Sequence, residues 1–298
     1  MPLSAFTPQV REWFGRAFAA PTPAQEQAWP AIATGEHTLI SAPTGSGKTL
    51  AAFLWALDRL VADPTADRTR LVYVSPLKAL SYDVEKNLRA PLRGIGADVK
   101  VATRTGDTPQ RERQAMVRHP PDILITTPES LYLMLTSQAA KIFDGAEQVI
   151  VDEIHAVAQT KRGAHLALTL ERLAEAAGRD VQRIGLSATQ NPLDEVGRFL
   201  VGPKRRCTVV DTGVRKPLDL QIHVPVESMV EPGAGPELDP FEGTGQEATR
   251  KSIWPAIYPK LLDLVREHRS TLIFVNNRRG AERLALRLNE LAEAAAEG

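Results

Sequence analysis

The chain has 298 residues, 43% apolar and 24% charged, enough for one domain of ordinary size and part of a second. Lys plus Arg and Asp plus Glu both number 36, so a nucleic-acid site would have to be a local basic patch. The single cysteine, Cys207, excludes a disulfide framework and a CxxC metal site within the chain. No signal-like N-terminus is present, and no apolar run reaches the roughly 18 residues of a membrane span. We therefore expect a cytoplasmic protein with no membrane partner.

Short apolar runs alternate with helical patterns over most of the first domain, which is typical of a wound α/β fold. The runs are mostly Val, Ile or Leu, as in parallel strands buried on both faces. They lie at residues 38–41, 71–75, 99–103, 123–126, 149–151 and 183–187. Apolar residues at helical spacing, as in 50–61 and 166–177, predict the covering helices. In such a sheet, ligands bind beyond the carboxyl ends of the strands.

The composition changes at 225–249, which contains four Pro, four Gly, six acidic residues and no basic one, and predicts a mobile acidic loop. After it we expect helices at 257–268 and 279–296 with a strand at 271–275 between them. This final stretch is too short to form a core of its own. The predicted domains are therefore 1–205, a linker with strands and the acidic loop at 206–252, and an incomplete second domain at 253–298.

The segment Ala42-Pro-Thr-Gly-Ser-Gly-Lys-Thr49 follows a predicted strand and leads into a helix, as a phosphate-binding loop requires. Its glycines allow backbone N–H groups to approach phosphate oxygens, and the helix N-terminus adds its positive end. Lys48 is expected to reach the β and γ phosphates of ATP, and Thr49 to ligate Mg²⁺. The alternative is a Gly-rich turn with a chance lysine. The predicted ATP-binding residues in this loop are Ala42, Thr44, Gly45, Ser46, Gly47, Lys48 and Thr49.

Asp152 and Glu153 follow the apolar run 149–151, so both carboxylates are expected where the phosphate loop lies. ATP hydrolysis needs a metal that bridges phosphate oxygens and a water positioned for in-line attack. We assign Asp152 to the metal, and Glu153 to orienting and deprotonating that water. Without the upstream loop, an acidic pair at a strand end would more often be a solvated turn. Lys48, Asp152 and Glu153 are the predicted catalytic residues.

Taken in order, the phosphate loop, Asp152-Glu-Ile-His155 and Ser187-Ala-Thr189 resemble superfamily-two helicases of the DEAD/DEAH-box type. Ser75-Pro-Leu-Lys-Ala-Leu80 and Thr127-Pro-Glu-Ser-Leu131 resemble in particular the large helicase-related (Lhr) family. The segment 272–279 resembles the start of that family's second RecA-like domain. The resemblance implies a RecA-like P-loop NTPase domain with a wound, mostly parallel sheet, followed by an incomplete second RecA-like domain.

The same resemblance implies roles for further residues. Gln25, in Pro21-Thr-Pro-Ala-Gln25, matches a motif whose glutamine recognises adenine, although Pro-Thr-Pro alone is merely a turn. His155, Ser187 and Thr189 match the elements that couple nucleotide state to domain movement. Residues expected to hold a nucleic-acid backbone, each alternatively part of a solvated loop, are Pro76, Lys78, Arg104, Gly106, Thr127, Pro128 and Asn276.

The expected function is that of an ATP-dependent helicase or translocase. The resemblance implies a monomeric motor that moves 3′ to 5′ along single-stranded DNA or RNA, acts also on DNA/RNA hybrids, and serves DNA repair. Two alternatives remain: a non-catalytic nucleotide- or nucleic-acid-binding fragment, and a repair helicase or remodeller of a neighbouring branch. Arg278 and Arg279 lie too early to match the second domain's catalytic arginines, whose loss costs about 10³ to 10⁵ in rate in comparable enzymes. We therefore expect this chain alone to bind ATP weakly and hydrolyse it slowly.

Overall fold

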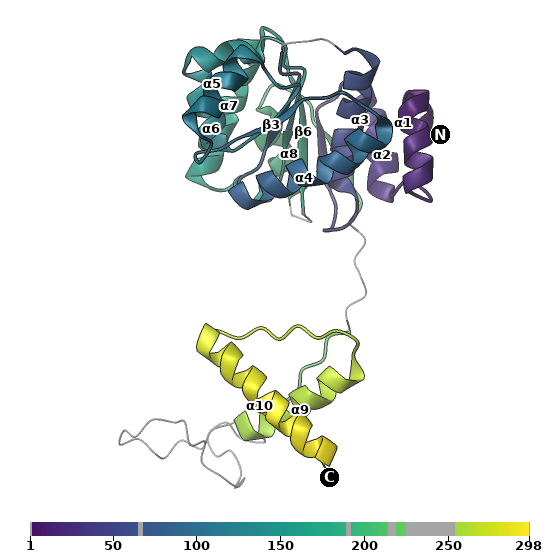
Figure 1. Ribbon diagram of the computed structural model, residues 1–298, viewed down its shortest axis with the longest axis vertical. Helices are drawn as coiled ribbons and strands as arrows, with labels where there is room; N and C mark the ends of the chain where they lie inside the picture. Colours follow the sequence, from purple (N-terminus) through teal and green to yellow (C-terminus); the bar gives the residue numbers. More distant parts are fainter. Residues whose placement is uncertain (1, 65–67, 189–191, 214–218, 225–253, 298) are drawn as a thin grey trace. The chain divides into compact units, whose positions relative to one another are not determined.

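The computed structural model describes residues 2–64, 68–188, 192–213, 219–224 and 254–297 (Figure 1). The chain divides into two compact units, Met1–Lys216 and Pro217–Gly298, and each is described by itself. Within the described ranges, no helix is both long enough and apolar enough to cross a membrane.

The first unit is built on a seven-stranded sheet in the order β3-β4-β2-β5-β6-β1-β7, with every pairing parallel. All six runs predicted as strands form strands, and the predicted wound parallel sheet is confirmed. The strands are β1 (Thr38–Ser41), β2 (Leu71–Val74), β3 (Val101–Arg104), β4 (Ile123–Thr126), β5 (Gln148–Val151), β6 (Gln182–Ser187) and β7 (Thr208–Asp211).

Successive residues of the strands face opposite sides of the sheet, and helices cover both sides (Figure 1). On β2, Leu71 and Tyr73 join one core, whereas Val72 and Val74 join the other. The first core is closed by α1 (Pro8–Ala17), α2 (Pro23–Ala33), α3 (Lys48–Ala62) and α4 (Lys78–Ile95). The second is closed mainly by α6 (Pro128–Leu135), α7 (Lys161–Ala177) and α8 (Leu193–Val201).

Shorter elements complete the first unit. They are α5 (Gln110–Arg118) and the 3-10 turns η1 (Pro2–Ala5), η2 (Gln138–Phe143) and η3 (Ile154–Ala156). α7 begins earlier than the predicted 166 because the Thr160 hydroxyl accepts a hydrogen bond from the Gly163 amide at 3.1 Å and caps the helix. β7, which follows the predicted boundary at residue 205, pairs with β1 and extends the sheet into the segment predicted as a linker.

The second unit contains α9 (Trp254–Glu267) and α10 (Arg278–Glu297), close to the predicted helices. Tyr258, Leu262 and Leu284 are buried. The predicted strand at 271–275 was wrong for this structure: the segment is assigned to no strand, and Leu272 and Phe274 are 85% and 91% exposed. An extended segment becomes a strand only when a neighbour exchanges backbone hydrogen bonds with it, and the described part of this unit offers none. The predicted acidic loop, 225–249, lies outside the described residues.

Candidate functional site

The phosphate loop, residues 42–49, connects the carboxyl end of β1 to the first turn of α3. Gly45 and Gly47 have φ values of 80° and 79°, in the left-handed region where other residues are strained. Lys48 is buried, and its ammonium donates a hydrogen bond to the Ala42 carbonyl oxygen at 3.2 Å. The lysine therefore lies against the loop's own backbone at a helix N-terminus, where anions bind in proteins.

Three buried hydroxyls around the loop have no hydrogen-bond partner among the described residues: Ser41, Ser46 and Ser187. Ser46 lies within the loop, while Ser41 and Ser187 are register partners at the ends of β1 and β6. Buried polar groups are normally satisfied by protein, water or ligand. These hydroxyl groups are therefore available to hydrogen-bond a ligand, which fits the binding of a phosphate-bearing molecule.

Asp152 follows β5 and is held at both carboxylate oxygens. Its Oδ1 accepts a hydrogen bond from the Glu153 amide at 2.8 Å, and its Oδ2 accepts one from the Tyr73 hydroxyl. Burial, followed by the charge of Asp152, raises the pKa of Tyr73, so the phenol keeps its proton and remains a donor. The Tyr73 ring stacks on Phe53 of α3, with centroids 5.1 Å apart. The orientation of the Asp152 carboxylate is thus fixed by the backbone and by a neighbouring strand.

Glu153 adopts a left-handed backbone conformation, with φ 46° and ψ 39°. Its carboxylate oxygen Oε2 lies 3.2 Å from His155 Nε2. His155 Nδ1 accepts a hydrogen bond from the Ala188 amide at 3.2 Å, which leaves the ring proton on Nε2, facing Glu153. The carbonyl of the preceding residue, Ser187, accepts from the Ala42 amide at 3.1 Å. His155 therefore connects Glu153 to a strand end that also contacts the phosphate loop. Thr189, predicted to act with Ser187, lies outside the described residues.

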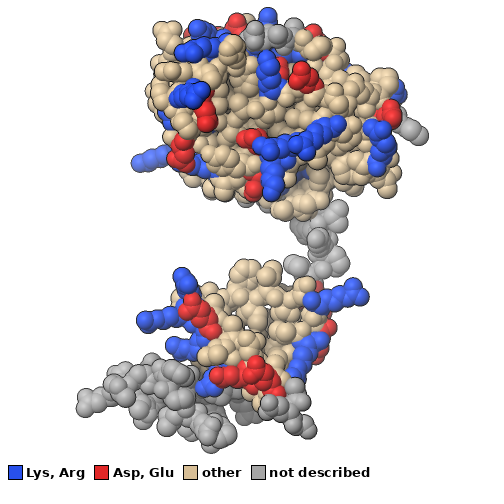
Figure 2. All heavy atoms as spheres, in the orientation of Figure 1, with Lys and Arg blue, Asp and Glu red and all other residues tan. Residues whose placement is uncertain are grey.

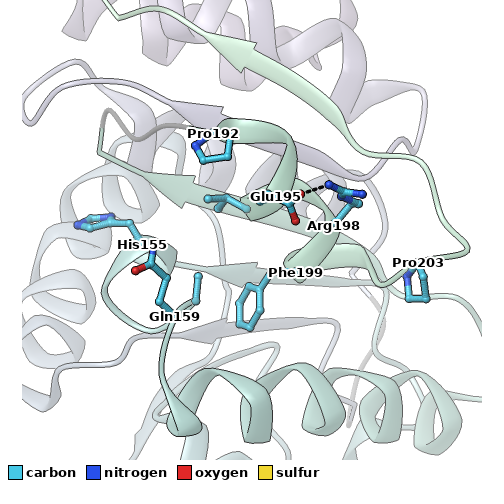
Figure 3. Close-up of a pocket in the computed structure, with 9 residues that line it drawn as sticks. His155, Gln159, Pro192, Glu195, Arg198, Phe199 and Pro203 are labelled. Atoms are coloured by element: carbon cyan, nitrogen blue, oxygen red, sulfur yellow. Dashed lines mark hydrogen bonds and ion pairs between the residues drawn. The ribbon is translucent and has the colours of Figure 1, made fainter.

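His155 also lines a pocket of about 400 Å³ between the loop after η3 and helix α8 (Figure 3). Gln159 and Phe199 lie on two sides of this pocket, and an ion pair between Glu195 and Arg198 lies at its margin. The wall is a mixture of apolar and polar groups. The His155 side chain is 22% exposed, so water can reach this side of the site.

Gln25, the predicted adenine reader, uses both ends of its side-chain amide inside the protein. Its Oε1 accepts from the Thr22 amide at 3.0 Å, as half of a capping box at the start of α2, and its Nε2 donates to the Gly47 carbonyl at 3.4 Å. Gln25 is only 3% exposed. It therefore connects α2 to the phosphate loop, and adenine recognition stays a prediction that would use the second donor and the second lone pair of the amide.

The loops that follow β3, β4 and β2 lie side by side, because these strands are neighbours in the sheet. The Lys78 ammonium donates to both carboxylate oxygens of Asp107, at 2.9 and 3.0 Å. It lies next to Gly106, where an added Cβ would be 3.6 Å from Lys78 Nζ. Arg104 is half-buried, and burial followed by the nearby charge of Arg113 lowers its pKa. The structure thus places Lys78 beside Gly106, which follows Arg104 by two residues.

Thr127 and Pro128 begin α6 at the end of β4. The Thr127 hydroxyl accepts from the Ser130 amide at 3.4 Å and is buried, so it is engaged in capping the helix. Pro76 follows β2, and its carbonyl accepts a hydrogen bond from Arg162 at 2.6 Å. Asn276 is exposed and belongs to the second unit. In the view of Figure 2, basic and acidic side chains are intermixed, in keeping with the zero net charge.

Two residues of the site had no signal in the sequence. Tyr73 lies in an apolar run and looks like an ordinary core aromatic; only the pairing of β2 with β5 brings its hydroxyl to Asp152. Arg162 stands in the first turn of α7, where a solvated arginine is the usual expectation, and its partners lie on two other loops. Both roles depend on strand order, which a single sequence does not specify.

A parallel sheet in this order, with a phosphate loop after β1 and an acidic pair after β5, defines a RecA-like P-loop domain. A family profile described as DEAD/DEAH box helicase matches residues 22–196, more than half of the chain. The chain belongs to the DEAD/DEAH box helicase family.

Several relatives are similar over nearly the whole chain. The chain is 52% identical to an Lhr helicase/probable uracil glycosylase of Mycolicibacterium smegmatis, covering 97% of this chain and 19% of that protein. It is 43% identical to an ATP-dependent helicase Lhr-Core of Methanocaldococcus jannaschii, covering 95% and 33%. A structure of the Mycobacterium smegmatis helicase Lhr bound to ssDNA and AMP-PNP aligns with a TM-score of 0.77 at 51% identity, covering 99% of this chain and 37% of that one. The chain therefore spans about a fifth to a third of the curated relatives' length.

Proposed function

We propose that this chain is the ATP-binding part of an Lhr-type helicase or translocase motor, which couples ATP hydrolysis to movement along single-stranded DNA or RNA. The observation that carries the proposal is the pair of contacts made by His155, with Glu153 on one side and the Ala188 amide on the other. These contacts connect a candidate hydrolytic carboxylate to a strand end that also touches the phosphate loop. A purely structural histidine would not need to join these two elements.

In this proposal the phosphate loop binds the nucleotide. Lys48 and the backbone amides around Gly45 and Gly47 bind phosphate oxygens, and the buried Ser46 hydroxyl gains the partner it lacks. Thr49 and Asp152 would hold Mg²⁺, which would supply positive charge to offset the charge of the phosphates. The donor set fits this ion, since Mg²⁺ in nucleotide sites prefers oxygen ligands and uses only one or two protein carboxylates.

Glu153 acts in this proposal as the base that orients the attacking water and takes its proton. The His155 N–H faces the Glu153 carboxylate at 3.2 Å and would keep it turned toward the site. When the carboxylate or the phosphate changes state, the Ala188 end of β6 is the first backbone to respond, because it bonds the same histidine. This is the proposed route from hydrolysis to domain movement.

The proposed partner is single-stranded DNA or RNA, gripped by the loops after β2, β3 and β4. Lys78, Arg104 and Gly106 offer charge and backbone donors that contact phosphate without reading bases. The M. smegmatis relative bound to ssDNA and AMP-PNP supports this pairing of ligands. Action on DNA/RNA hybrids, a monomeric state and a role in repair belong to the same proposal.

The test compares wild type with Lys48→Ala and Glu153→Gln, in this chain and, where the coding sequence continues in frame, in the longer product. We expect Lys48→Ala to abolish binding of a fluorescent ATP analogue. We expect Glu153→Gln to bind the analogue as wild type does and to stop turnover, measured as phosphate release with and without single strands. Normal turnover in Glu153→Gln would show that another group is the base.

One alternative is a non-catalytic module that binds nucleotide or nucleic acid. It predicts analogue binding without any phosphate release, in this chain and in any longer product alike. A remodeller of a neighbouring branch predicts instead that double-stranded nucleic acid stimulates hydrolysis as well as single strands do. Stimulation assays with single-stranded DNA, single-stranded RNA, duplex and hybrid separate these outcomes.

A further inference from the structure

Arg162, in the first turn of α7, makes three hydrogen bonds to two separate segments, the loop after β2 and the first turn of α6. Its Nη1 donates to the Pro76 carbonyl oxygen at 2.6 Å. Its Nε and Nη2 donate to the two carboxylate oxygens of Glu129, the latter at 2.9 Å, in a bidentate pair. Pro76 follows β2 and Glu129 lies in the first turn of α6, after β4. One side chain therefore ties together two of the three loops proposed to grip a nucleic-acid strand.

Arg162 is also tied by a short path of hydrogen bonds to the hydrolytic loop, the segment after β5 that contains Glu153 and η3. The Thr160 hydroxyl donates to the Val157 carbonyl at 2.8 Å and accepts from the Gly163 amide at 3.1 Å. Gly163 has no room for a side chain, because an added Cβ would collide with the Val157 carbonyl group. Val157 in turn closes η3, which begins directly after Glu153. The backbone that carries Arg162 is thus held against the segment that begins directly after the proposed base, Glu153.

The charge of Glu129 gives this arrangement a second consequence. A carboxylate placed between Thr127 and the loop after β2 would repel the phosphates of a bound strand. The hydrogen bond from Arg162, opposed in part by burial, lowers the pKa of Glu129, so the carboxylate stays ionised and needs its partner. With Arg162 in place, the pair is neutral overall. Without it, a free negative charge would stand beside the proposed strand path.

We propose that Arg162 is a positioning residue for nucleic-acid stimulation: it holds the loops after β2 and β4 at fixed separation from the hydrolytic loop, and it neutralises Glu129 beside the strand. This inference rests on the proposed function. The bonds of Arg162 go to Pro76 and Glu129 and not to the phosphate loop, so its loss should act on the strand and leave nucleotide binding unchanged.

The chain offers a matched control in Arg205. Its Nη1 and Nη2 bind the two carboxylate oxygens of Glu171 at 2.8 and 3.0 Å, and Nη1 also donates to the Val201 carbonyl at 3.0 Å. This is the same type of contact set as that of Arg162. Arg205 precedes β7, so it lies at the amino edge of the sheet, opposite the proposed site. Thermal unfolding of Arg162→Ala and Arg205→Ala measures how far each loss is merely structural.

The experiment measures binding of a labelled single strand by fluorescence anisotropy, phosphate release at increasing strand concentration, and affinity for AMP-PNP. It uses the 298-residue chain and any longer product encoded in frame. We expect Arg162→Ala to raise the strand concentration at half-maximal effect about tenfold, the size expected for a lost charge-assisted bond. AMP-PNP affinity should not change, and Arg205→Ala should match wild type in all three assays. The strand concentration at half-maximal effect for Arg162→Lys should lie between those of wild type and Arg162→Ala, because one ammonium cannot make the bidentate pair.

The double variant Arg162→Ala with Glu129→Gln tests the charge argument, and should recover part of the lost strand affinity. No recovery, or equal strand dependence in Arg162→Ala and Arg205→Ala, would overturn the inference while leaving the proposed function intact. If wild type neither binds single strands nor is stimulated by them, the proposed function fails, and this inference with it.

Discussion

Tyr73→Phe removes one hydroxyl from the centre of the first unit. The ring remains stacked on Phe53, so no cavity forms, and what is lost is the hydrogen bond to Asp152 Oδ2. A hydrogen bond to a charged group contributes about 1.5 to 3 kcal/mol, and Asp152 is only 6% exposed, so water replaces the bond poorly. We expect the free energy of unfolding to fall by about 2 kcal/mol. For a unit of this size the melting temperature should fall by about 4 to 8 °C.

The surroundings of Tyr73 also determine how the stability difference between wild type and Tyr73→Phe depends on pH. Because the pKa of Tyr73 is raised in the folded state, the unfolded chain loses the phenolic proton above about pH 10 while the folded chain keeps it. The hydrogen bond therefore contributes fully to the free energy of unfolding of wild type below that pH. This contribution is lost as the pH rises further. Since phenylalanine cannot titrate, the gap between wild type and variant should narrow above pH 10.

Urea unfolding followed by tryptophan fluorescence, near neutral pH and above pH 10, measures both effects. Tyr82→Phe is the matched control: Tyr82 is 51% exposed, and its change should stay within about 0.5 kcal/mol. If Tyr73→Phe is as stable as the control near neutral pH, the hydroxyl does not support Asp152, and this reasoning fails.

Two further predictions concern other parts of the first unit. Burial lowers the pKa of His37, whose Nδ1 accepts the Arg183 amide hydrogen at 3.0 Å, so the unfolded chain binds the proton more readily. The free energy of unfolding should therefore decline as the pH falls below 6.5. The urea midpoint of His37→Gln should decline less over the same range. Asp58 is fully buried and accepts hydrogen bonds from the Thr7 amide and hydroxyl, both at 2.7 Å. Asp58→Ala should therefore lower the free energy of unfolding by about 3 kcal/mol and expose the N-terminal helix to protease. Unchanged cleavage of that helix would contradict this prediction.

The sequence was most informative where local pattern alone determines structure. Most strands of this parallel sheet are continuous apolar runs, so six of the seven were located from the sequence, and a phosphate loop is a contiguous motif. The sequence also predicted that the end of β6 and the acidic pair, Asp152 and Glu153, lie at the carboxyl edge of the sheet, because parallel strands run in the same direction. These inferences need no knowledge of which strand neighbours which.

What the sequence did not reveal depends on contacts between distant segments. Tyr73 reaches Asp152 only because β2 pairs with β5, and Arg162 reaches Glu129 only because the loops after β2, β4 and β5 are neighbours. The Thr22-x-x-Gln25 spacing fits a capping box, but the bond from the Gln25 amide to the Gly47 carbonyl joins distant segments, and no local motif predicts it. The segment 271–275 has a strand's composition, but β structure is a property of pairs.

The left-handed backbone of Glu153 implies a conflict between two kinds of selection. A non-glycine residue held in that region costs folding about 1 to 3 kcal/mol, whereas glycine or asparagine adopts it more readily. A library of variants screened only for heat resistance would therefore favour replacement of Glu153, the proposed base. The most thermostable members would then lack the proposed base. The difference in unfolding free energy between Glu153 and a glycine or asparagine at this position is the stability that the protein gives up for turnover.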